Sequence, residues 1–313
     1  MTDISTLTGQ TMGGLFQLRL PQLQKAAHLL GAVQSILDLV DTQMSGWSDT
    51  SDLARINAAP LLNWVPVPKE MAEVVALGLK MADETQGALN ICMGHNARVY
   101  GHGTNNAPLG GTAPASINPT IALGLDLKNL RIQRRMDVLL DLNSIAKGYS
   151  VDLVSAYLKT QGVTDFVLEV AGDIYATGKR PNGMPWTVGL ELPLPDKSVP
   201  LRFVPLVNCA IATSGNYRRY SSSKNGIAGH VIDPTTGQAM DELYASVTVI
   251  AQSSARADAL ATALFTMGPK TGLAFATQSN IAATFISRSA DGFIEQGSPA
   301  MFDYLEKQER VGT

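Results

Sequence analysis

Residues 141–149 read Asp-Leu-Asn-Ser-Ile-Ala-Lys-Gly-Tyr, and they decide the fold class expected for this chain. They follow the apolar run Val138-Leu139-Leu140 and lead into a helical repeat of Val151, Val154 and Leu158. This pattern predicts a strand, a tight turn and a helix over about residues 145–161. The N–H groups at such a helix start form a natural anion site. Lys147 could reach a phosphate oxygen there, although a lone lysine is more often surface charge.

The same alternation of strands and helices extends in both directions from this stretch. Helices are predicted over about 21–43 and 69–86, the second closed by Gly87, and strands over about 11–19, 165–170 and 186–192. The C-terminal third predicts a strand (246–251), a helix (256–267), a short helix (270–276) and a strand (282–287). Residues 102–120 are rich in Gly, Asn, Pro and Ala, which predicts a loop. The expected class is α+β, with mixed helix and sheet layers.

Composition supports a large globular protein without naming its chemistry. With 313 residues, 45% of them apolar, the chain can bury a sizeable core as one large domain or as two fused halves. A net charge of −3 gives no electrostatic case for nucleic acid or for an anionic membrane. Cys92 and Cys209 match no zinc or redox spacing and are interpreted as small buried residues.

Residues 257–264 place two oxygen ligands on an otherwise apolar helix. Asp258 and Thr262 are four residues apart, so they share one face. A carboxylate and a hydroxyl stacked in this way suit Mg²⁺, which takes oxygen ligands and usually keeps substrate phosphates in its shell. The alternative is structural, because an early helical Asp is often a dipole partner or a cap and a mid-helix Thr often bonds its own backbone.

Two upstream segments also carry polar groups. Residues 229–237 end an apolar run in Asp-Pro-x-x-Gly, a turn signal that places His230 at or beside the start of a short strand. A histidine here is a candidate for proton transfer near neutral pH, or it closes the turn by hydrogen bonding. Residues 212–220 gather hydroxyls, a glycine and Arg218 and Arg219, which could hold phosphate or form a solvated hairpin.

These segments, in this order, resemble the FAD:protein FMN transferase family, also known as the ApbE family. The family's Asp-Leu-Gly-x-Ile-Ala-Lys-Gly-Tyr segment is similar to 141–149, and its Gly-Gly-Asp turn to 171–173. Its Thr-Ser-Gly-x-Tyr-Arg segment is similar to 213–218, its His-Ile-Ile-Asp-Pro-x-Thr-Gly segment to 230–237, and its Ala-Asp-x-x-x-Thr-Ala segment to 257–263. Five ordered motifs are far more specific than any one of them.

The N-terminal half resembles the family more loosely. Residues 12–14 are similar to its opening Met-Gly-Thr, and residues 44–57 to its Met-Ser-x-Tyr/Trp motif with the Ser, Leu and Asn that follow, so that Trp47 would stack on a flat ring. The clearest departure lies at 87–94, where Asn90 replaces a carboxylate and Cys92 a hydroxyl. Asn keeps the shape and one acceptor but loses the charge. His95 stands where the family often has Pro.

The resemblance implies an enzyme that uses Mg²⁺ to cleave the pyrophosphate of FAD, transfers FMN to a Thr or Ser hydroxyl of an acceptor flavoprotein, and releases AMP. It further implies a layered, T-fold-like architecture over residues 1–313, as one domain or two intertwined subdomains. By motif position, Asp258, Thr262 and the main-chain carbonyl of Ser144 would hold the metal, and His230 with Asp258 would be catalytic. FAD would be lined by Met12, Trp47, Ala88, Leu89, Asn90, Asp141, Lys147 and Val231.

Two other functions stay open at this point. An FAD pyrophosphatase would use the same residues but let water attack, and a non-catalytic FAD-binding protein would bind FAD without releasing AMP. The start of the chain has no basic n-region, apolar h-region or lipoprotein cysteine, and no stretch is long and apolar enough to span a membrane. A cytoplasmic location is therefore expected, with an exported form whose signal has been removed as the alternative.

Overall fold

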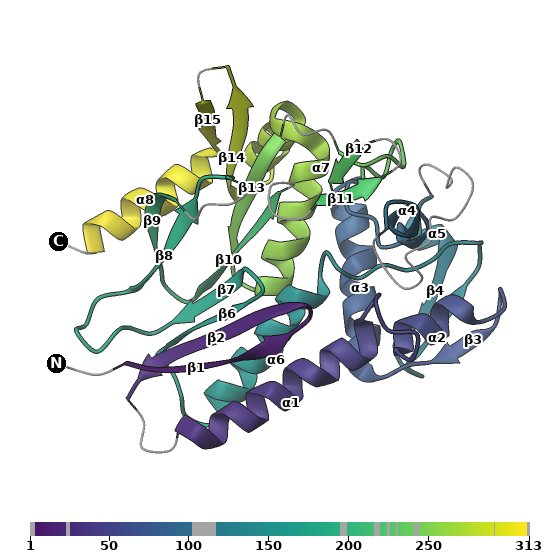
Figure 1. The fold of residues 1–313 in the computed structure, drawn as a ribbon, viewed down its shortest axis with the longest axis horizontal. Coiled ribbons are helices and arrows are strands. Elements are labelled where there is room, and N and C mark those ends of the chain that lie inside the picture. Colours follow the sequence, from purple (N-terminus) through teal and green to yellow (C-terminus); the bar gives the residue numbers. More distant parts are fainter. Residues whose placement is uncertain are drawn as a thin grey trace. The chain divides into compact units, whose positions relative to one another are not determined.

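The computed structural model describes residues 4–22, 26–101, 117–194, 199–215, 220–223, 226–229, 231–240, 244–290 and 292–311 (Figure 1). The chain forms two compact units. The first comprises residues 1–39, 147–218 and 244–313, and the second comprises residues 40–146 and 219–243. Among the described residues, no helix has the length and apolar character needed to cross a membrane.

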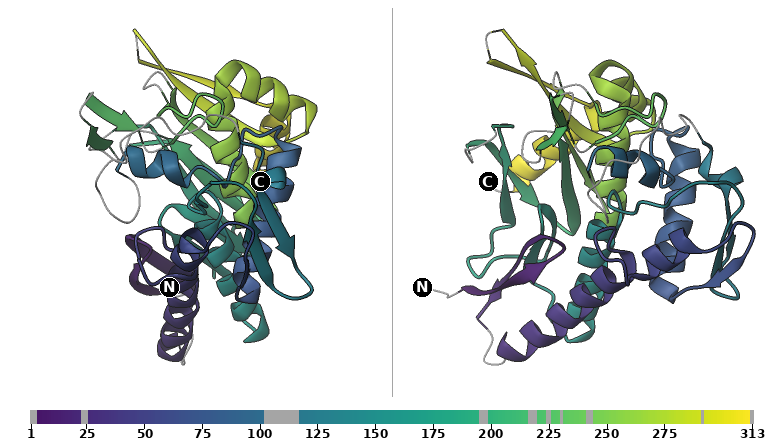
Figure 2. Two further views of the ribbon diagram at one scale, coloured as in Figure 1. Left: turned by 90° about the vertical axis from the view of Figure 1, so that its right-hand side faces the viewer. Right: turned by 45° about the vertical axis from the view of Figure 1, so that its right-hand side comes forward.

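The first unit is built on an eight-stranded antiparallel sheet, which can be followed in Figures 1 and 2. Its strands lie in the order β1-β2-β6-β7-β10-β13-β14-β15. Their bounds are β1 Ile4–Thr11, β2 Gly14–Pro21, β6 Phe166–Val170, β7 Asp173–Thr177, β10 Cys209–Gly215, β13 Tyr244–Ala251, β14 Ala282–Ser289 and β15 Gly292–Gly297. The helices of this unit are most of α1 (Ala26–Met44), α6 (Ala146–Thr160), α7 (Ser254–Gln278) and α8 (Pro299–Val311), and a separate ribbon pairs β8 (Trp186–Glu191) with β9 (Pro200–Leu206).

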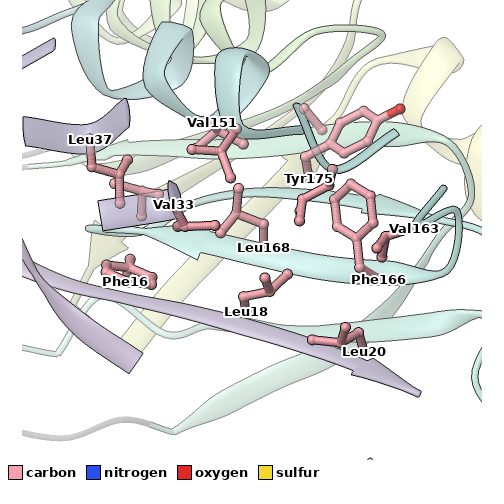
Figure 3. Close-up of a cluster of buried hydrophobic side chains, with 14 of the residues drawn as sticks. Phe16, Leu18, Leu20, Val33, Leu37, Val151, Val163, Phe166, Leu168 and Tyr175 are labelled. Atoms are coloured by element: carbon pink, nitrogen blue, oxygen red, sulfur yellow. The ribbon is translucent and has the colours of Figure 1, made fainter. Parts of the chain in front are cut away.

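Side chains cover both faces of this sheet. On one face, Phe16, Leu18 and Leu168 pack with residues of α1 and α6 such as Val33 and Val151 (Figure 3). Alternation fixes this arrangement, since the register pairs Leu18 with Leu168 and Phe16 with Val170, so these side chains share one side. The opposite face buries Ala176, Ile211 and Ile250 against the β8–β9 ribbon and α8. The sheet is therefore the middle layer of the first unit.

Two tight turns in this sheet have left-handed residues at both central positions. Met12 and Gly13 have φ of 48° and 71° between β1 and β2, and Ala171 and Gly172 have φ of 48° and 101° between β6 and β7. Positive φ at both positions is the type I′ geometry that suits the twist of two-residue hairpins. The second turn places Asp173 at the first position of β7.

The second unit combines small sheets with short helices. Its three-stranded antiparallel sheet has the order β3-β5-β4, with bounds Trp64–Pro66, Arg131–Arg134 and Leu123–Asp126. The helices are α2 (Asp52–Ala58), α3 (Lys69–Glu84), α4 (Gly94–Val99) and α5 (Pro119–Ala122), and a two-stranded ribbon pairs β11 (Tyr220–Ser223) with β12 (Gly226–Gly229). Met93, Ala97 and Ile232 form a small core that packs the start of α4 against residues 231–240.

The structure confirms most of the predicted long elements and corrects several others. The helices over 145–161 and 69–86 are α6 and α3, and the predicted helices 256–267 and 270–276 form α7, which Gly268 and Pro269 interrupt. The opening strand predicted over 11–19 corresponds to β2, and a turn at Met12 and Gly13 separates it from β1, which ends at Thr11. The helix predicted over 21–43 is α1 (Ala26–Met44), but Pro21 belongs to β2, and residues 23–25 lie outside the described residues.

Residues 138–140 were predicted as a strand, which is wrong because their backbone bonds irregularly. Leu140 exchanges hydrogen bonds with the amide of Asn57, and the Leu139 carbonyl accepts from Gly94 N–H. Most of the predicted loop 102–120 lies outside the described residues, and its end forms α5.

A matched pair of leucines in β2 tests which face of the sheet carries stability. Leu18 is fully buried, whereas 65% of Leu15 is exposed. Leu18→Ala should lower the free energy of unfolding by about 2–5 kcal/mol through lost burial and a cavity. Leu15→Ala should change it by about 0.5 kcal/mol or less. Urea unfolding measures both, and equal losses would contradict the layer assignment.

Candidate functional site

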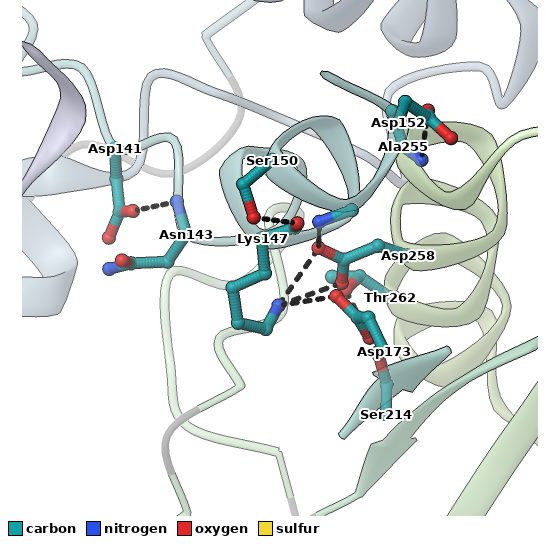
Figure 4. Close-up of polar contacts among 11 residues, drawn as sticks. Asp141, Asn143, Lys147, Ser150, Asp152, Asp173, Ser214, Ala255, Asp258 and Thr262 are labelled. Carbon is teal, nitrogen blue, oxygen red and sulfur yellow. Dashed lines mark hydrogen bonds and ion pairs between the residues drawn. The ribbon is translucent and has the colours of Figure 1, made fainter. Parts of the chain in front are cut away.

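Lys147 lies between two acidic side chains of the first unit (Figure 4). Its Nζ donates to both carboxylate oxygens of Asp258, at 3.0 and 2.8 Å, and lies 3.4 Å from Oδ2 of Asp173. The backbone N–H of Gly148 also donates to Asp258, at 3.3 Å. The lysine that the sequence left open as surface charge is therefore the cation of a polar cluster.

Three elements supply the members of this cluster. Lys147 is in the first turn of α6, Asp258 is in the second turn of α7, and Asp173 follows the type I′ turn at the start of β7. The carboxylates of Asp258 and Asp173 are almost fully buried, whereas 28% of the Lys147 side chain is exposed. The site is thus open on the lysine side.

Two hydroxyl groups extend the cluster along α7 and β10. The hydroxyl of Thr262 lies 3.1 Å from that of Ser214, an inward-facing residue of β10. Asp258 does not cap its own helix, because Ser253 and Asp152 accept the first N–H groups of α7. The arrangement therefore argues against the capping alternative for Asp258.

This cluster contains two carboxyl groups but only one ammonium group. Burial raises the pKa of Asp173 well above its usual value, and the neighbouring Asp258 carboxylate raises it further, while Lys147 opposes both effects. Burial lowers the pKa of Lys147, but attraction to Asp173 and Asp258 outweighs burial and leaves that pKa raised. Oδ2 of Asp173 is buried and accepts no hydrogen bond. Two carboxylates thus share one ammonium group.

The donor chemistry of this cluster fits a hard cation. Its oxygen donors are two carboxylates and two hydroxyls, and Mg²⁺ prefers oxygen ligands and is often held by one or two protein carboxylates. Over the described ranges, no three or more His, Cys, Asp or Glu side chains gather as a metal-binding group, so a cation here would complete its shell with hydroxyls, main chain, water or substrate. A magnesium-type site therefore fits better than an imidazole or thiolate site.

The second unit contains a small cavity of about 30 Å³ with both polar and apolar lining residues, large enough for a water-sized group. Its lining residues come from three separate segments, within 45–57, 94–98 and 139–143. They include Gly46, Asn57, Arg98 and Asp141. Asn57 holds Leu140 by two hydrogen bonds of 3.0 and 2.8 Å, and Asp141 accepts from Asn143 N–H at 2.8 Å. The structure thus brings together the motif at 44–57 and the start of the motif at 141–149. Trp47 lies in the sequence between Gly46 and Ser48, which line this cavity, and it is 54% exposed.

The segment 88–92 is mostly committed to internal contacts. Leu89 is 1% exposed, so its side chain belongs to the core, while Ala88 is half-buried. The Asn90 side chain accepts from Cys92 N–H and donates to the Ile117 carbonyl, both at 2.8 Å. A carboxylate could not donate to that carbonyl unless protonated. Burial raises the pKa of the Cys92 thiol to about 12, which keeps it neutral.

The remaining predicted site residues are placed less completely. Met12 lies in the β1–β2 turn and packs against the sheet core, and Ser144 lies in the turn before α6. Val231 is buried and its carbonyl accepts from Met240 N–H, but the predicted strand reduces to one bridge between Ile232 and Ala239. His230 and residues 216–219 lie outside the described residues.

Sequence reasoning missed three residues of this region. From the sequence, Asp173 is only part of a turn, Ser214 is only part of a hydroxyl-rich segment, and Asp152 has no predicted role. The signal for Asp152 was its position on the predicted helix, five residues after Lys147. Nothing in the sequence pairs Asp173 with Lys147, because strand order decides that contact.

Comparison with known proteins identifies the family. The family model described as "ApbE family" matches residues 12–285. The chain belongs to the ApbE family. It is 31% identical to "FAD:protein FMN transferase" of Vibrio cholerae over 96% of this chain and 92% of that protein, and 28% identical to the Escherichia coli K12 protein of the same name over 98% and 91%.

Solved structures agree with this family. The apo form of the Pseudomonas stutzeri flavinyl transferase ApbE has a TM-score of 0.84 and 31% identity, covering 97% of both chains. The Thermotoga maritima apbe protein, at 24% identity, shares the fold with a TM-score of 0.83 over 97% of this chain and 99% of that one. The mixed helix and sheet fold predicted from sequence is that of these ApbE proteins.

Removing the shared cation should expose the repulsion between the two carboxylates. Lys147→Met keeps a side chain of similar length but leaves Asp173 and Asp258 without their ammonium partner. Removing one partner of a buried pair lowers the free energy of unfolding by about 3–5 kcal/mol. We expect a decrease near the lower end of this range, because Lys147 is partly exposed. The loss is measured by urea unfolding at pH 7, with Lys80→Met, whose lysine is 68% exposed, as the control.

The pH dependence of this variant has a definite sign. A carboxyl group whose pKa is raised in the folded state stabilises the fold when it is protonated, and this stabilisation is lost as the pH rises through the folded pKa. Acidification from pH 7 toward the unfolded pKa of about 3.9 should therefore stabilise Lys147→Met relative to wild type. A variant that instead loses stability relative to wild type on acidification would contradict this account.

Proposed function

We propose that this chain transfers FMN from FAD to a Thr or Ser hydroxyl of an acceptor flavoprotein, with Mg²⁺ and with release of AMP. The proposal rests on the shared family and on the names of the relatives, which are FAD:protein FMN transferases. The observation that carries its metal-dependent part is the buried oxygen cluster around Asp258, in which Oδ2 of Asp173 has an ion pair with Lys147 but accepts no hydrogen bond.

Asp258 and the hydroxyl of Thr262 are the proposed metal ligands of the first unit, and the main-chain carbonyl of Ser144 is the third. When bound, Mg²⁺ would neutralise the negative charge that develops on the phosphates during transfer. Asp258 can contact both Lys147 and a cation, because an ionised carboxylate has about four lone-pair sites. Lys147 would itself donate to a phosphate oxygen from the exposed side of the cluster.

The proposed FAD contacts come from the segments identified by sequence. In the second unit, the exposed indole of Trp47 offers a flat surface for a ring, and Asp141 lines the small cavity. Ala88, Leu89 and Asn90 would contribute mainly backbone and shape, because the Leu89 side chain is in the core and the Asn90 amide is bonded to backbone at both ends. Val231 would likewise contribute mainly backbone and shape. Met12 and Lys147 are the proposed FAD contacts of the first unit.

His230 is the proposed base for the acceptor hydroxyl. In phosphoryl transfer the protein mainly positions the reactants and stabilises charge, and the attacking hydroxyl must lose its proton. An imidazole with an ordinary pKa of about 6.5 can accept that proton near neutral pH. In the described part of this segment, Asn96 of α4 donates to the Gly237 carbonyl at 2.8 Å, which anchors the turn after His230.

The alternative is hydrolysis, in which water replaces the acceptor hydroxyl and the products are free FMN and AMP. The non-catalytic alternative was based on Asn90. The Asn90 amide bonds to backbone on both sides, which fixes its position, and the uncharged amide remains the sequence feature that favours this alternative.

The decisive experiment incubates the chain with FAD, Mg²⁺ and an acceptor carrying a flavinylation motif. We expect an FMN-sized mass gain on the acceptor matched by AMP release, and both should be lost with EDTA and in Asp258→Ala. Asp165→Ala is a control that removes an acidic side chain which bonds Lys179 N–H in a different part of the first unit. AMP without a mass gain on any acceptor would favour hydrolysis, and bound FAD without AMP would favour the binding protein.

A further inference from the structure

We propose that Asp152 is a positioning residue for Asp258, which it aligns by fastening the first turn of α7 to α6. The consequence for catalysis rests on the proposed function, whereas the geometry does not. Asp152 lies on α6, and its two carboxylate oxygens accept from the backbone N–H groups of Ser254 and Ala255, at 2.7 and 2.9 Å. Figure 4 shows this contact on the α7 side of the cluster.

These bonds complete the N-terminus of α7. A helix starts with four N–H groups that lack partners within the helix. Here Asp152 accepts from Ser254 and Ala255, and the Ser253 hydroxyl accepts from Arg256. The first bond within the helix runs from the Ala257 N–H to the Ser253 carbonyl. Three of these N–H groups are therefore satisfied by side chains, and the Asp152 carboxylate of α6 supplies two of the three bonds.

A second, independent contact with α6 involves the same residue of α7, Ser254. A Cβ placed on Gly148 would lie 2.3 Å from the Ser254 carbonyl oxygen and 2.7 Å from the Cα of Ala255, both backbone atoms. The backbones of α6 and α7 thus touch at Gly148, one turn before Asp152 on the same face of α6. Gly148 and Asp152 together hold Ser254 from two positions.

The connection from this joint to the polar cluster is short. Ser254 and Asp258 are four residues apart, so they lie on one face of α7. On α6, Gly148 itself donates to Asp258, and Lys147 precedes it. A small rotation or shift of the first turn of α7 therefore moves the Asp258 carboxylate relative to Lys147.

Asp152→Asn tests the proposal without changing side-chain volume. The amide oxygen can still accept one N–H, but the amide nitrogen then faces the other N–H, so the clamp is broken on one side. Asp165→Asn is the matched control, because Asp165 also accepts a backbone N–H within the first unit, from Lys179 at 2.7 Å, away from the α6–α7 joint.

Two readouts are made on the full chain. The first is the rate at which a small amine-reactive reagent labels Lys147, followed by mass spectrometry, since the ion pair with Asp258 shields that amine. The second is the steady-state rate of FMN transfer, measured at a temperature well below the melting temperature of each variant. We expect faster labelling of Lys147 in Asp152→Asn than in wild type and Asp165→Asn. We also expect kcat to fall by roughly tenfold to a hundredfold with a smaller change in KM for FAD, the scale of a misplacement of about 1 Å.

Unchanged labelling of Lys147 in Asp152→Asn would overturn the proposal, and so would equal acceleration in Asp165→Asn, which would indicate general loosening. If wild type transfers no FMN, the proposed function fails, and the labelling comparison still decides whether Asp152 positions Asp258. Faster labelling in Asp152→Asn alone supports the positioning role in either case.

Discussion

The site depends on the contact between the backbones of α6 and α7. Gly148 allows the two helices to meet at Ser254 without a side chain between them. Only this close approach lets a side chain from the first turn of α6 reach a carboxylate in the second turn of α7. The pairing of Lys147 with Asp258 is thus set by the approach of two helices, while the sheet adds Asp173 from β7 and Ser214 from β10.

The electrostatics of the cluster follow from that packing. Packing buries Asp258 close to Asp173, and like charges in a buried site raise each other's cost of ionisation. Lys147 offsets part of this cost while staying partly exposed. Such a site favours further positive charge, and a cation that also binds phosphate would serve both needs. Structure and proposed chemistry therefore share one cause.

The sequence predicted elements whose patterns are local. The helix from residue 146 and the helix from 254 have clear apolar repeats, and the turn at 171–173 carries its own glycine signal. It missed β1, because Ile-Ser-Thr-Leu-Thr-Gly-Gln-Thr has few apolar residues and gains its stability from pairing with β2. It predicted a strand at 138–140 because an apolar run alone cannot show whether a partner strand exists.

The site was predicted in the same uneven way. Asp258 and Thr262 follow from helical spacing, but the pairing of Lys147 with Asp173 joins residues that only the sheet order and the helix crossing bring together. The proposed function depends on a divalent cation at the Asp258 cluster. Anomalous diffraction from crystals grown with Mn²⁺ in place of Mg²⁺ tests it most directly. The account predicts a peak at bonding distance, roughly 2.1 Å, from Asp258 and Thr262 oxygens. Mn²⁺ bound elsewhere, with Asp258 contacting only Lys147 and Gly148, would contradict it.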